Sequence, residues 1–311
     1  MKNTLRSVIA YSLYPFLLAA TLAVIVVTLR NHWDLQRSMS HYLPALLVVL
    51  MLAERAFPMS PRWGMTWRSF WRDIRYLAMD GAVIAGTRLA AGLLALRLAE
   101  TYPGPLAHAS VLMAVPIGLL TWDLAQYALH RYSHEGKGPV AGFLWRAHLA
   151  HHLPDRLYVF MHGVFHPFNA FLNAALLQAV FLGLGLSPEA VFAAMLLIDL
   201  QTIVSHFNVE IRAGWFNYLF IGTELHRAHH SAEVEEAGNY GTILSIWDLV
   251  FGSFRYRPGV APVSLGVHPE PGLPLSEEVL RVLAHPFRAS ASGGAGRNPA
   301  WGSRPAESPA A

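Results

Sequence analysis

The sequence contains no cysteine and few charged residues. Charged side chains make up 14% of the 311 residues, whereas 54% of the residues are hydrophobic. Without cysteine the chain cannot form disulfides, iron–sulfur clusters or a thiolate-ligated haem, so a bound metal must be held by His, Asp or Glu. The formal net charge is only +3, which gives no basis for a nucleic-acid-binding surface. This composition is typical of a multi-span membrane protein with no nucleic-acid partner.

Apolar runs recur along the chain and predict membrane-spanning helices. They cover residues 8–29, 42–57, 74–98, 106–129, 168–186 and 189–205. The first run has about the 20 residues that a spanning helix needs and no small-residue cleavage site after it, so we expect a retained helix. The second is short and contains Pro44, so a span and a re-entrant segment both stay open. The stretch GLGLSPEA predicts a hairpin between the last two runs.

Arginine and lysine are distributed unevenly between the predicted loops. Loops 54–75 and 130–167 are rich in basic residues, whereas turns 100–106 and 183–189 have none. Because basic loops stay in the cytoplasm, we expect both loops, the N-terminus and everything after residue 206 on that side. Arg30 and Arg37 fall on the opposite side, so the second span is the weakest part of this topology. The expected divisions are N-terminal spans (1–105), a catalytic domain (106–257) and a C-terminal tail (258–311), disordered from about residue 287.

Three histidine clusters follow the predicted spans. They are His130-x-x-x-His134, His148-x-x-His151-His152 and His226-x-x-His229-His230. On a helix, residues three or four apart share a face, so each cluster can direct several imidazoles at one point. Imidazole suits iron, zinc and copper. Eight ligands exceed the needs of one ion but suit two.

Other polar residues lie near these clusters. Asp123 and Tyr127 continue the helical stripe of His130 and His134, and Asp199 lies seven residues before His206. Acids in membrane helices are candidate functional residues, and metal-bound imidazoles often donate their second N–H to a carboxylate. We expect these acids to support the ligands; a hydrogen bond between helices is the alternative. His166, four residues after His162, is a candidate ligand or cavity residue.

At these residues the sequence resembles the fatty acid hydroxylase/sterol desaturase superfamily of membrane di-metal oxygenases. The matching segments, within about 117–257, are WDLAQYALHRYSH, FLWRAHLAHH, ELHRAHHSAE and NYGTILSIWDLVFGSF. The resemblance implies an all-α, multi-span transmembrane bundle of four to six spans with a cytoplasmic helical cap that carries a histidine-rich di-metal site. It implies two iron ions held by His130, His134, His148, His151, His152, His206, His226, His229 and His230. Asn239, in the NYG segment, is a further supporting candidate.

The family resemblance also implies a reaction. Members hydroxylate or desaturate lipids with O₂ and external electrons. The sequence has no Rossmann or haem-type His-Pro-Gly-Gly motif, so a separate electron-transfer protein or reductant is expected. Glu135, directly after His134, matches the tetrahydropterin-dependent alkylglycerol monooxygenase branch, which makes a tetrahydropterin one candidate donor and an ether lipid one candidate substrate.

The sequence leaves the substrate open. Leu153 and Pro154 follow the second cluster where many members have Ser, and Val164 stands near a position where many have Arg. Sterols, hopanoids, acyl chains, ether lipids and amino-acid-containing head groups therefore all remain candidates, with carotenoids less favoured. A zinc hydrolase would need a motif such as H-E-x-x-H, which is missing from the sequence. A metal-binding or metal-transport membrane protein is the non-enzymatic alternative.

Overall fold

The chain folds into helices joined by loops and isolated bridges, without β-strands in residues 2–98 and 101–288, which the computed structural model describes. The long helices are α1 (Lys2–Arg30), α2 (Leu35–Ala56), α3 (Trp67–Leu98), α4 (Val111–Glu135), α6 (Pro167–Leu184) and α7 (Pro188–Ser205). The shorter helices are α5 (Pro139–His152), α8 (Thr223–His229), α9 (Ile246–Phe251) and α10 (Val279–Ala284). The predicted all-α class is confirmed.

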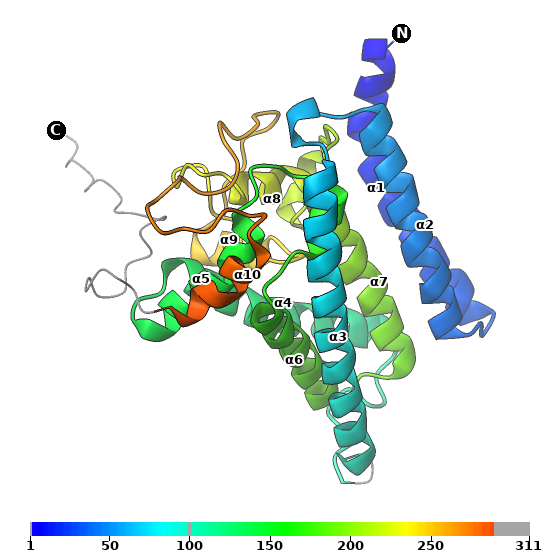
Figure 1. The fold of residues 1–311 in the computed structure, drawn as a ribbon. Coiled ribbons are helices and arrows are strands. Elements are labelled where there is room, and N and C mark those ends of the chain that lie inside the picture. The colour runs from blue at the N-terminus through cyan, green and yellow to red at the C-terminus, as the bar shows by residue number, and fades with distance from the viewer. Residues whose placement is uncertain (1, 99–100, 289–311) are drawn as a thin grey trace, which may run out of the picture.

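The six long helices form the bundle. Each is long and apolar enough to cross a membrane, which agrees with the predicted spans. Figure 1 shows α1 and α2 as a pair on one side of the bundle, and α5, α8, α9 and α10 on the other. Helix α7 packs against α1, α2 and α4, while α6 packs against α3 and α4. The second run is a continuous helix despite Pro44, and it is not re-entrant in shape.

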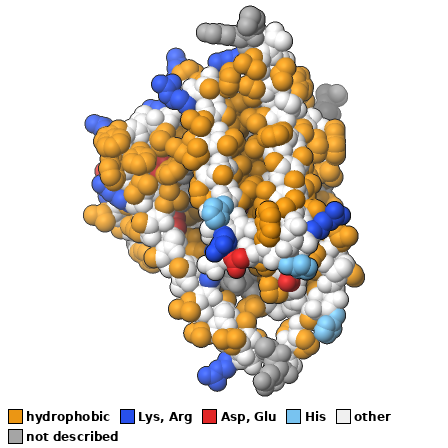
Figure 2. All heavy atoms as spheres, turned by 90° about the vertical axis from the view of Figure 1, so that its right-hand side faces the viewer, with side chains coloured by type: hydrophobic (Ala, Val, Ile, Leu, Met, Phe, Trp, Pro, Cys, Tyr) orange, Lys and Arg blue, Asp and Glu red, His pale blue; other side chains and the backbone are white. Residues whose placement is uncertain are grey.

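Apolar side chains cover the outside of the bundle. Figure 2 shows a face on which hydrophobic side chains dominate over most of the surface. Phe16 is 66% exposed on α1, and Leu52 is 64% exposed on α2. Large exposed apolar area is costly in water but matches the hydrocarbon core of a bilayer. This surface is therefore a lipid-facing one.

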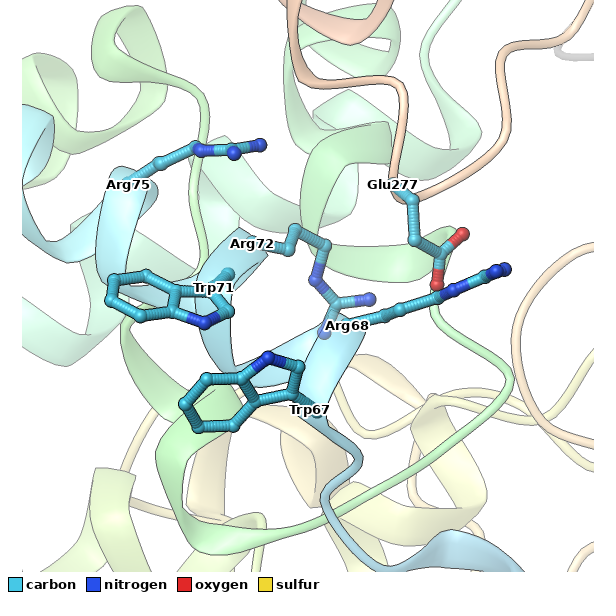
Figure 3. Close-up of a pocket in the computed structure, with 6 residues that line it drawn as sticks. All are labelled: Trp67, Arg68, Trp71, Arg72, Arg75 and Glu277. Atoms are coloured by element: carbon cyan, nitrogen blue, oxygen red, sulfur yellow. The ribbon is translucent and has the colours of Figure 1, made fainter.

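The first turns of α3 carry tryptophan and arginine. Trp67 and Trp71 meet edge to face, with ring centroids 5.4 Å apart, beside a surface hollow of about 630 Å³ that Arg68 and Arg75 also line (Figure 3). Tryptophan and arginine are enriched where a spanning helix meets the head groups. The start of α3 therefore has the composition of a membrane–water interface.

The hairpin predicted between α6 and α7 is present. Gly185 ends α6 with φ at 69°, a left-handed conformation that glycine adopts without a steric penalty. A Cβ at this position would lie 2.0 Å from the carbonyl oxygen of Pro103, so glycine also permits the close approach of the 103–104 loop. Ser187 then caps α7 by accepting a hydrogen bond from the Ala190 N–H.

Part of the expected C-terminal tail packs against the core. Leu265, Val279 and Val282 are buried in one cluster with Tyr158 and Ala150. The structure therefore includes the segment up to residue 288 in the fold. The disorder expected from about residue 287 falls almost wholly beyond residue 288, outside the described residues.

Candidate metal centre

The structure brings all nine predicted histidine ligands together in two adjacent groups. Within each group the candidate ligand atoms all lie within 4.8 Å of one another. The groups contact each other, since the rings of His152 and His230 stack at 4.5 Å. The first group is His130, His134, His148, His152 and His229, and the second is His151, His206, His226 and His230.

The helical spacing explains how each H-x-x-H-H cluster serves both groups. His148 and His152 are four residues apart and share the first group, while the intervening His151 joins the second. Consecutive residues point about 100° apart on a helix, so neighbouring imidazoles face different groups. The third cluster makes the reverse division: His226 and His230 are in the second group and His229 is in the first.

The Nε2 atoms have the spacing of ligands that share an ion. In the first group, His130 Nε2 lies 3.0 Å from His148 Nε2 and 3.2 Å from His134 Nε2. In the second group, His206 Nε2 lies 3.1 Å from both His151 Nε2 and His226 Nε2. Imidazole–metal bonds of about 2.0–2.1 Å place two ligands at right angles roughly 3 Å apart. The donor sets therefore fit one metal ion in each group.

Hydrogen bonds at the opposite ring nitrogen hold several imidazoles in place. In the first group, Nδ1 of His130 lies 2.8 Å from Tyr240 O, that of His148 2.9 Å from Asn169 Oδ1, and that of His229 2.7 Å from Gly238 O. In the second group, Nδ1 of His151 lies 3.1 Å from Val164 O and that of His206 3.0 Å from Thr202 O. A carbonyl oxygen can only accept, so Nδ1 donates and Nε2 keeps its lone pair.

Burial keeps the imidazoles uncharged. Removal from water lowers the pKa of His148 and the pKa of His206 to about 3. Burial, with the nearby His230 as the next cause, also holds the pKa of His152 well below its usual value. Neutral imidazole is the metal-binding form, so the fold presents these side chains as ligands at neutral pH.

Two buried carboxylates hold the loop that supplies two of the Nδ1 acceptors. Asp123 accepts hydrogen bonds from the backbone N–H groups of residues 242, 243 and 244, at 3.1, 2.9 and 3.2 Å. Asp248 accepts from the N–H of Tyr240 at 2.7 Å and of Gly241 at 2.8 Å. Asp123 was expected to bond a histidine directly. The structure instead places it behind the loop, so its contact with the ligands is indirect.

Three other expected supporting residues also lie behind the ligands. Tyr127 bonds Ser253 Oγ at 2.8 Å, and Glu135 accepts from the hydroxyl of Tyr240 at 2.9 Å. Asn239 adopts a positive φ of 53° and donates to the carbonyl oxygens of residues 225 and 255. These residues therefore shape the turn that carries Tyr240.

His166 and Asp199 lie elsewhere. His166 caps α6 by accepting from the Phe168 N–H, and its Nε2 lies 3.1 Å from Leu283 O. It belongs to neither histidine group. Asp199 lines a cavity beside the groups, and in the described part of the chain its carboxylate accepts no hydrogen bond from a histidine.

Asn169 was not predicted from the sequence. Its side chain accepts from His148, and it sits in the first turn of α6, where the chain leaves the His166-Pro167 cap. In the sequence, only its place as an amide residue among apolar residues, three positions after His166, could have indicated a role for Asn169. Asp80 was also missed, although an acid within an apolar span is an accepted functional signal.

The cavity beside the histidines has a volume of about 380 Å³. It lies between α3, α4, α6 and α7, and both histidine groups line it, through His130 and His148 from the first and His151, His206 and His226 from the second. The remaining lining combines apolar side chains, such as Leu77, Ile84 and Leu177, with polar ones. A substrate in this cavity would therefore lie directly against both groups.

Comparison with known proteins gives a family match over the same region. Residues 115–253 match the model of the family described as fatty acid hydroxylase, and this range contains all nine histidines. This match supports the predicted resemblance to the fatty acid hydroxylase/sterol desaturase superfamily. Together with the six apolar helices, it supports the predicted assignment as an integral membrane protein.

Two relatives show how far the similarity extends. The chain is 28% identical over 321 residues to the ornithine lipid hydroxylase OlsE of Rhizobium tropici. The alignment covers 98% of this chain and 90% of that protein. It is also 28% identical over 140 residues to the very-long-chain aldehyde decarbonylase GL1-9 of Oryza sativa subsp. indica, covering 44% of this chain and 52% of the relative. No solved structure matches the chain.

The fatty acid hydroxylase match begins within α4. Helix α3 lies outside the matched residues, yet it supplies Leu77, Asp80, Ile84 and Arg88 to the cavity wall. The family region therefore contains the histidines, while an N-terminal helix completes the space beside them. Differences in α3 can alter the cavity without changing the ligand set.

Proposed function

We propose that this chain is a membrane-bound lipid hydroxylase that holds two iron ions on its nine histidines and uses O₂ with externally supplied electrons. The convergence of two buried imidazole groups on adjacent points carries the proposal. Nine histidines in two groups exceed the three ligands typical of a catalytic zinc site. The groups are also gathered at one end of the bundle, not along a path through it, which argues against a transporter.

The residues around the proposed irons would orient the ligands and enclose the substrate. The Nδ1 acceptors fix the tautomer of the ligands, while the cavity walls hold the substrate and keep bulk water from the reacting carbon. The metals would supply the oxidising power to break an unactivated C–H bond, which no side chain can provide. Asp123 and Asp248 would act at a distance, by holding the loop whose carbonyls orient His130 and His229.

For the substrate, we propose a lipid with an amino-acid head group. The support is the similarity over 98% of the chain to a protein named as an ornithine lipid hydroxylase. The same similarity favours hydroxylation over desaturation. We do not propose the ether-lipid reaction, because the Glu135 carboxylate already accepts from Tyr240 and pairs with Arg131. The electron donor is proposed to be a separate protein or reductant.

We propose that the metal site faces the cytoplasm. The basic loops 54–75 and 130–167 meet, since Arg156 Nη1 donates to the carbonyl oxygen of Arg62 at 2.8 Å. Both loops lie at the histidine end of the bundle, and loops rich in arginine stay on the cytoplasmic side. A soluble reductant could then reach the site from that compartment.

Mass spectrometry of lipids from cells with and without the gene tests the proposed activity. A hydroxylase should produce lipids heavier by about 16 Da, the mass of one oxygen, whereas a desaturase should produce lipids lighter by about 2 Da. The His151→Ala variant should abolish the new lipid, and His108→Ala, which changes an exposed loop histidine, should not. An undiminished product from His151→Ala would refute the ligand assignment.

A further inference from the structure

Several buried polar atoms face the cavity without a partner. Asp80 Oδ1, Trp122 Nε1 and Gln126 Oε1 are enclosed and have no hydrogen-bond partner in the described residues, and all three residues line the cavity. Unpaired polar atoms inside a protein cost free energy unless something bonds them. Their shared position indicates a ligand with polar groups of its own, and not a simple hydrocarbon chain.

Asp80 lies next to the histidines. One carboxylate oxygen accepts from the Phe165 N–H at 3.2 Å, and the Phe165 ring stacks on His151 with centroids 4.5 Å apart. The residue is only 4% exposed. A buried carboxylate needs a cation or several donors to offset its lost hydration. Within the described chain Oδ1 has neither, so it is open to a donor from a bound ligand, and a cationic donor matches a carboxylate best.

A second carboxylate and one guanidinium lie farther along the same cavity. Asp199 is seven residues before His206 on α7, a rise of about 10 Å, and Arg88 is eight residues beyond Asp80 on α3, a rise of about 12 Å. Both line the cavity. The described residues offer the Asp199 side chain no hydrogen bond, and the charge of Arg88 acts on it without an ion-pair contact.

We infer that this cavity recognises a lipid head group through a primary amine, which Asp80 binds beside the histidines. An ammonium group has three donors, which the Asp80 carboxylate and other polar side chains of the cavity wall can accept. Asp199 and Arg88, farther along the cavity, are then available to other polar groups of the same lipid. This inference rests on the proposed function, since it concerns the lipid that reaches the histidines, and it makes Asp80 a specificity-determining residue.

A purely structural role, in which each acid pairs with another side chain of the protein, does not explain why Asp80 and Asp199 line the cavity. Asp80 and Asp199 come from different helices, and neither is in ion-pair contact with a described arginine or lysine. A neutral head group or an acyl chain would offer the Asp80 carboxylate no cationic partner. Sites built for a hydrogen-bonding group strongly reject analogues that lack it. The cavity should therefore select against lipids whose amine is blocked.

Equilibrium binding to the purified, full-length, metal-loaded protein tests the inference. The probes are an ornithine lipid and the same lipid with its side-chain amine acetylated, and the readout is lipid retained on the protein, measured by native mass spectrometry. The wild type should prefer the free amine by about 10- to 100-fold, the range expected for hydrogen bonds to a charged group. In Asp80→Asn this preference should shrink to a few-fold, with unchanged metal content.

The controls separate this inference from the proposed function. Asp155→Asn changes an acid whose side chain is 82% exposed and should keep the wild-type preference. Equal binding of the two probes to the wild type, or an undiminished preference in Asp80→Asn, would overturn the inference. If selective binding is found but no oxidised lipid forms, the proposed hydroxylation fails while the amine site stands. If an oxidised lipid forms but the wild type binds both probes equally, the amine site fails and the hydroxylase stands.

Discussion

At the scale of single residues, the hydrogen bond from His148 to Asn169 decides which ring nitrogen faces the first histidine group. Asn169 Oδ1 lies 2.9 Å from Nδ1, while Nε2 of the same ring lies 3.0 Å from His130 Nε2. Without an acceptor at Nδ1, the proton could move to Nε2 and remove the lone pair that a metal needs. Asn169 is therefore a positioning residue for the metal centre.

We expect Asn169→Ala to weaken metal retention by about 10- to 100-fold, the effect typical of removing a partner behind a metal ligand. The Asn169→Asp variant keeps an acceptor oxygen and should retain the metal nearly as well as wild type. Metal content after dialysis against a graded series of chelators measures the difference. Equal retention by Asn169→Ala and wild type would show that His148 is held by its helix alone.

The sequence predicts the ligands better than their hydrogen-bond acceptors. Helical spacing identifies His148 and His151 because histidines three or four residues apart share a helix face, and the chain has no cysteine that could serve as a ligand instead. Most acceptors are backbone carbonyls, such as those of Val164 and Gly238. Every residue carries a carbonyl, so nothing in the sequence distinguishes these two before the fold brings them to the rings.

At the scale of elements, the loop 238–244 is held from two sides. Asp123 on α4 and Asp248 on α9 accept its backbone N–H groups, and burial raises the pKa of Asp248. The loop in turn provides acceptors for His130 and His229. A loop of irregular backbone can thus hold ligands in fixed positions, because the N–H groups of residues 240–244 are directed at two fixed carboxylates.

Asp123→Ala should therefore destabilise this loop. It leaves three buried N–H groups without their acceptor, which should cost about 3 kcal/mol or more of unfolding free energy. Hydrogen–deuterium exchange should accelerate over residues 238–244, and the His130 side of the site should lose metal first. Thr121→Ala, which removes a hydroxyl bonded only within its own helix, is the matched control. Unchanged exchange in the loop would contradict the assigned role of Asp123.

The long helices could be predicted from the sequence, and the short elements less well. Spans follow from apolar runs of sufficient length, including α2, whose Pro44 leaves the helix continuous. The sequence around α10 gives little indication that this segment is packed, because Val279 and Val282 are buried by contacts with residues far away in the sequence. Burial of so short a helix depends on the tertiary fold and not on local periodicity.

At the scale of the whole molecule, the fold joins four separate segments at one place. The histidines come from the end of α4, from α5, from the residue after α7 and from α8 with the residue that follows it. The sequence predicts this convergence through the loop charges, which place the histidine-bearing ends on one side, and through the family resemblance, which implies one histidine-rich site. It does not predict that adjacent histidines divide between two groups, or that α3 closes the cavity.

Metal counting on the purified protein tests the central claim most directly. We predict two metal ions per chain in the wild type. His134→Ala in the first group and His206→Ala in the second should each lower the count to about one, because each variant disrupts one ligand set. The control His108→Ala should keep two. A wild-type count of one ion per chain, or variants in the two groups that leave it unchanged, would contradict the two-site account.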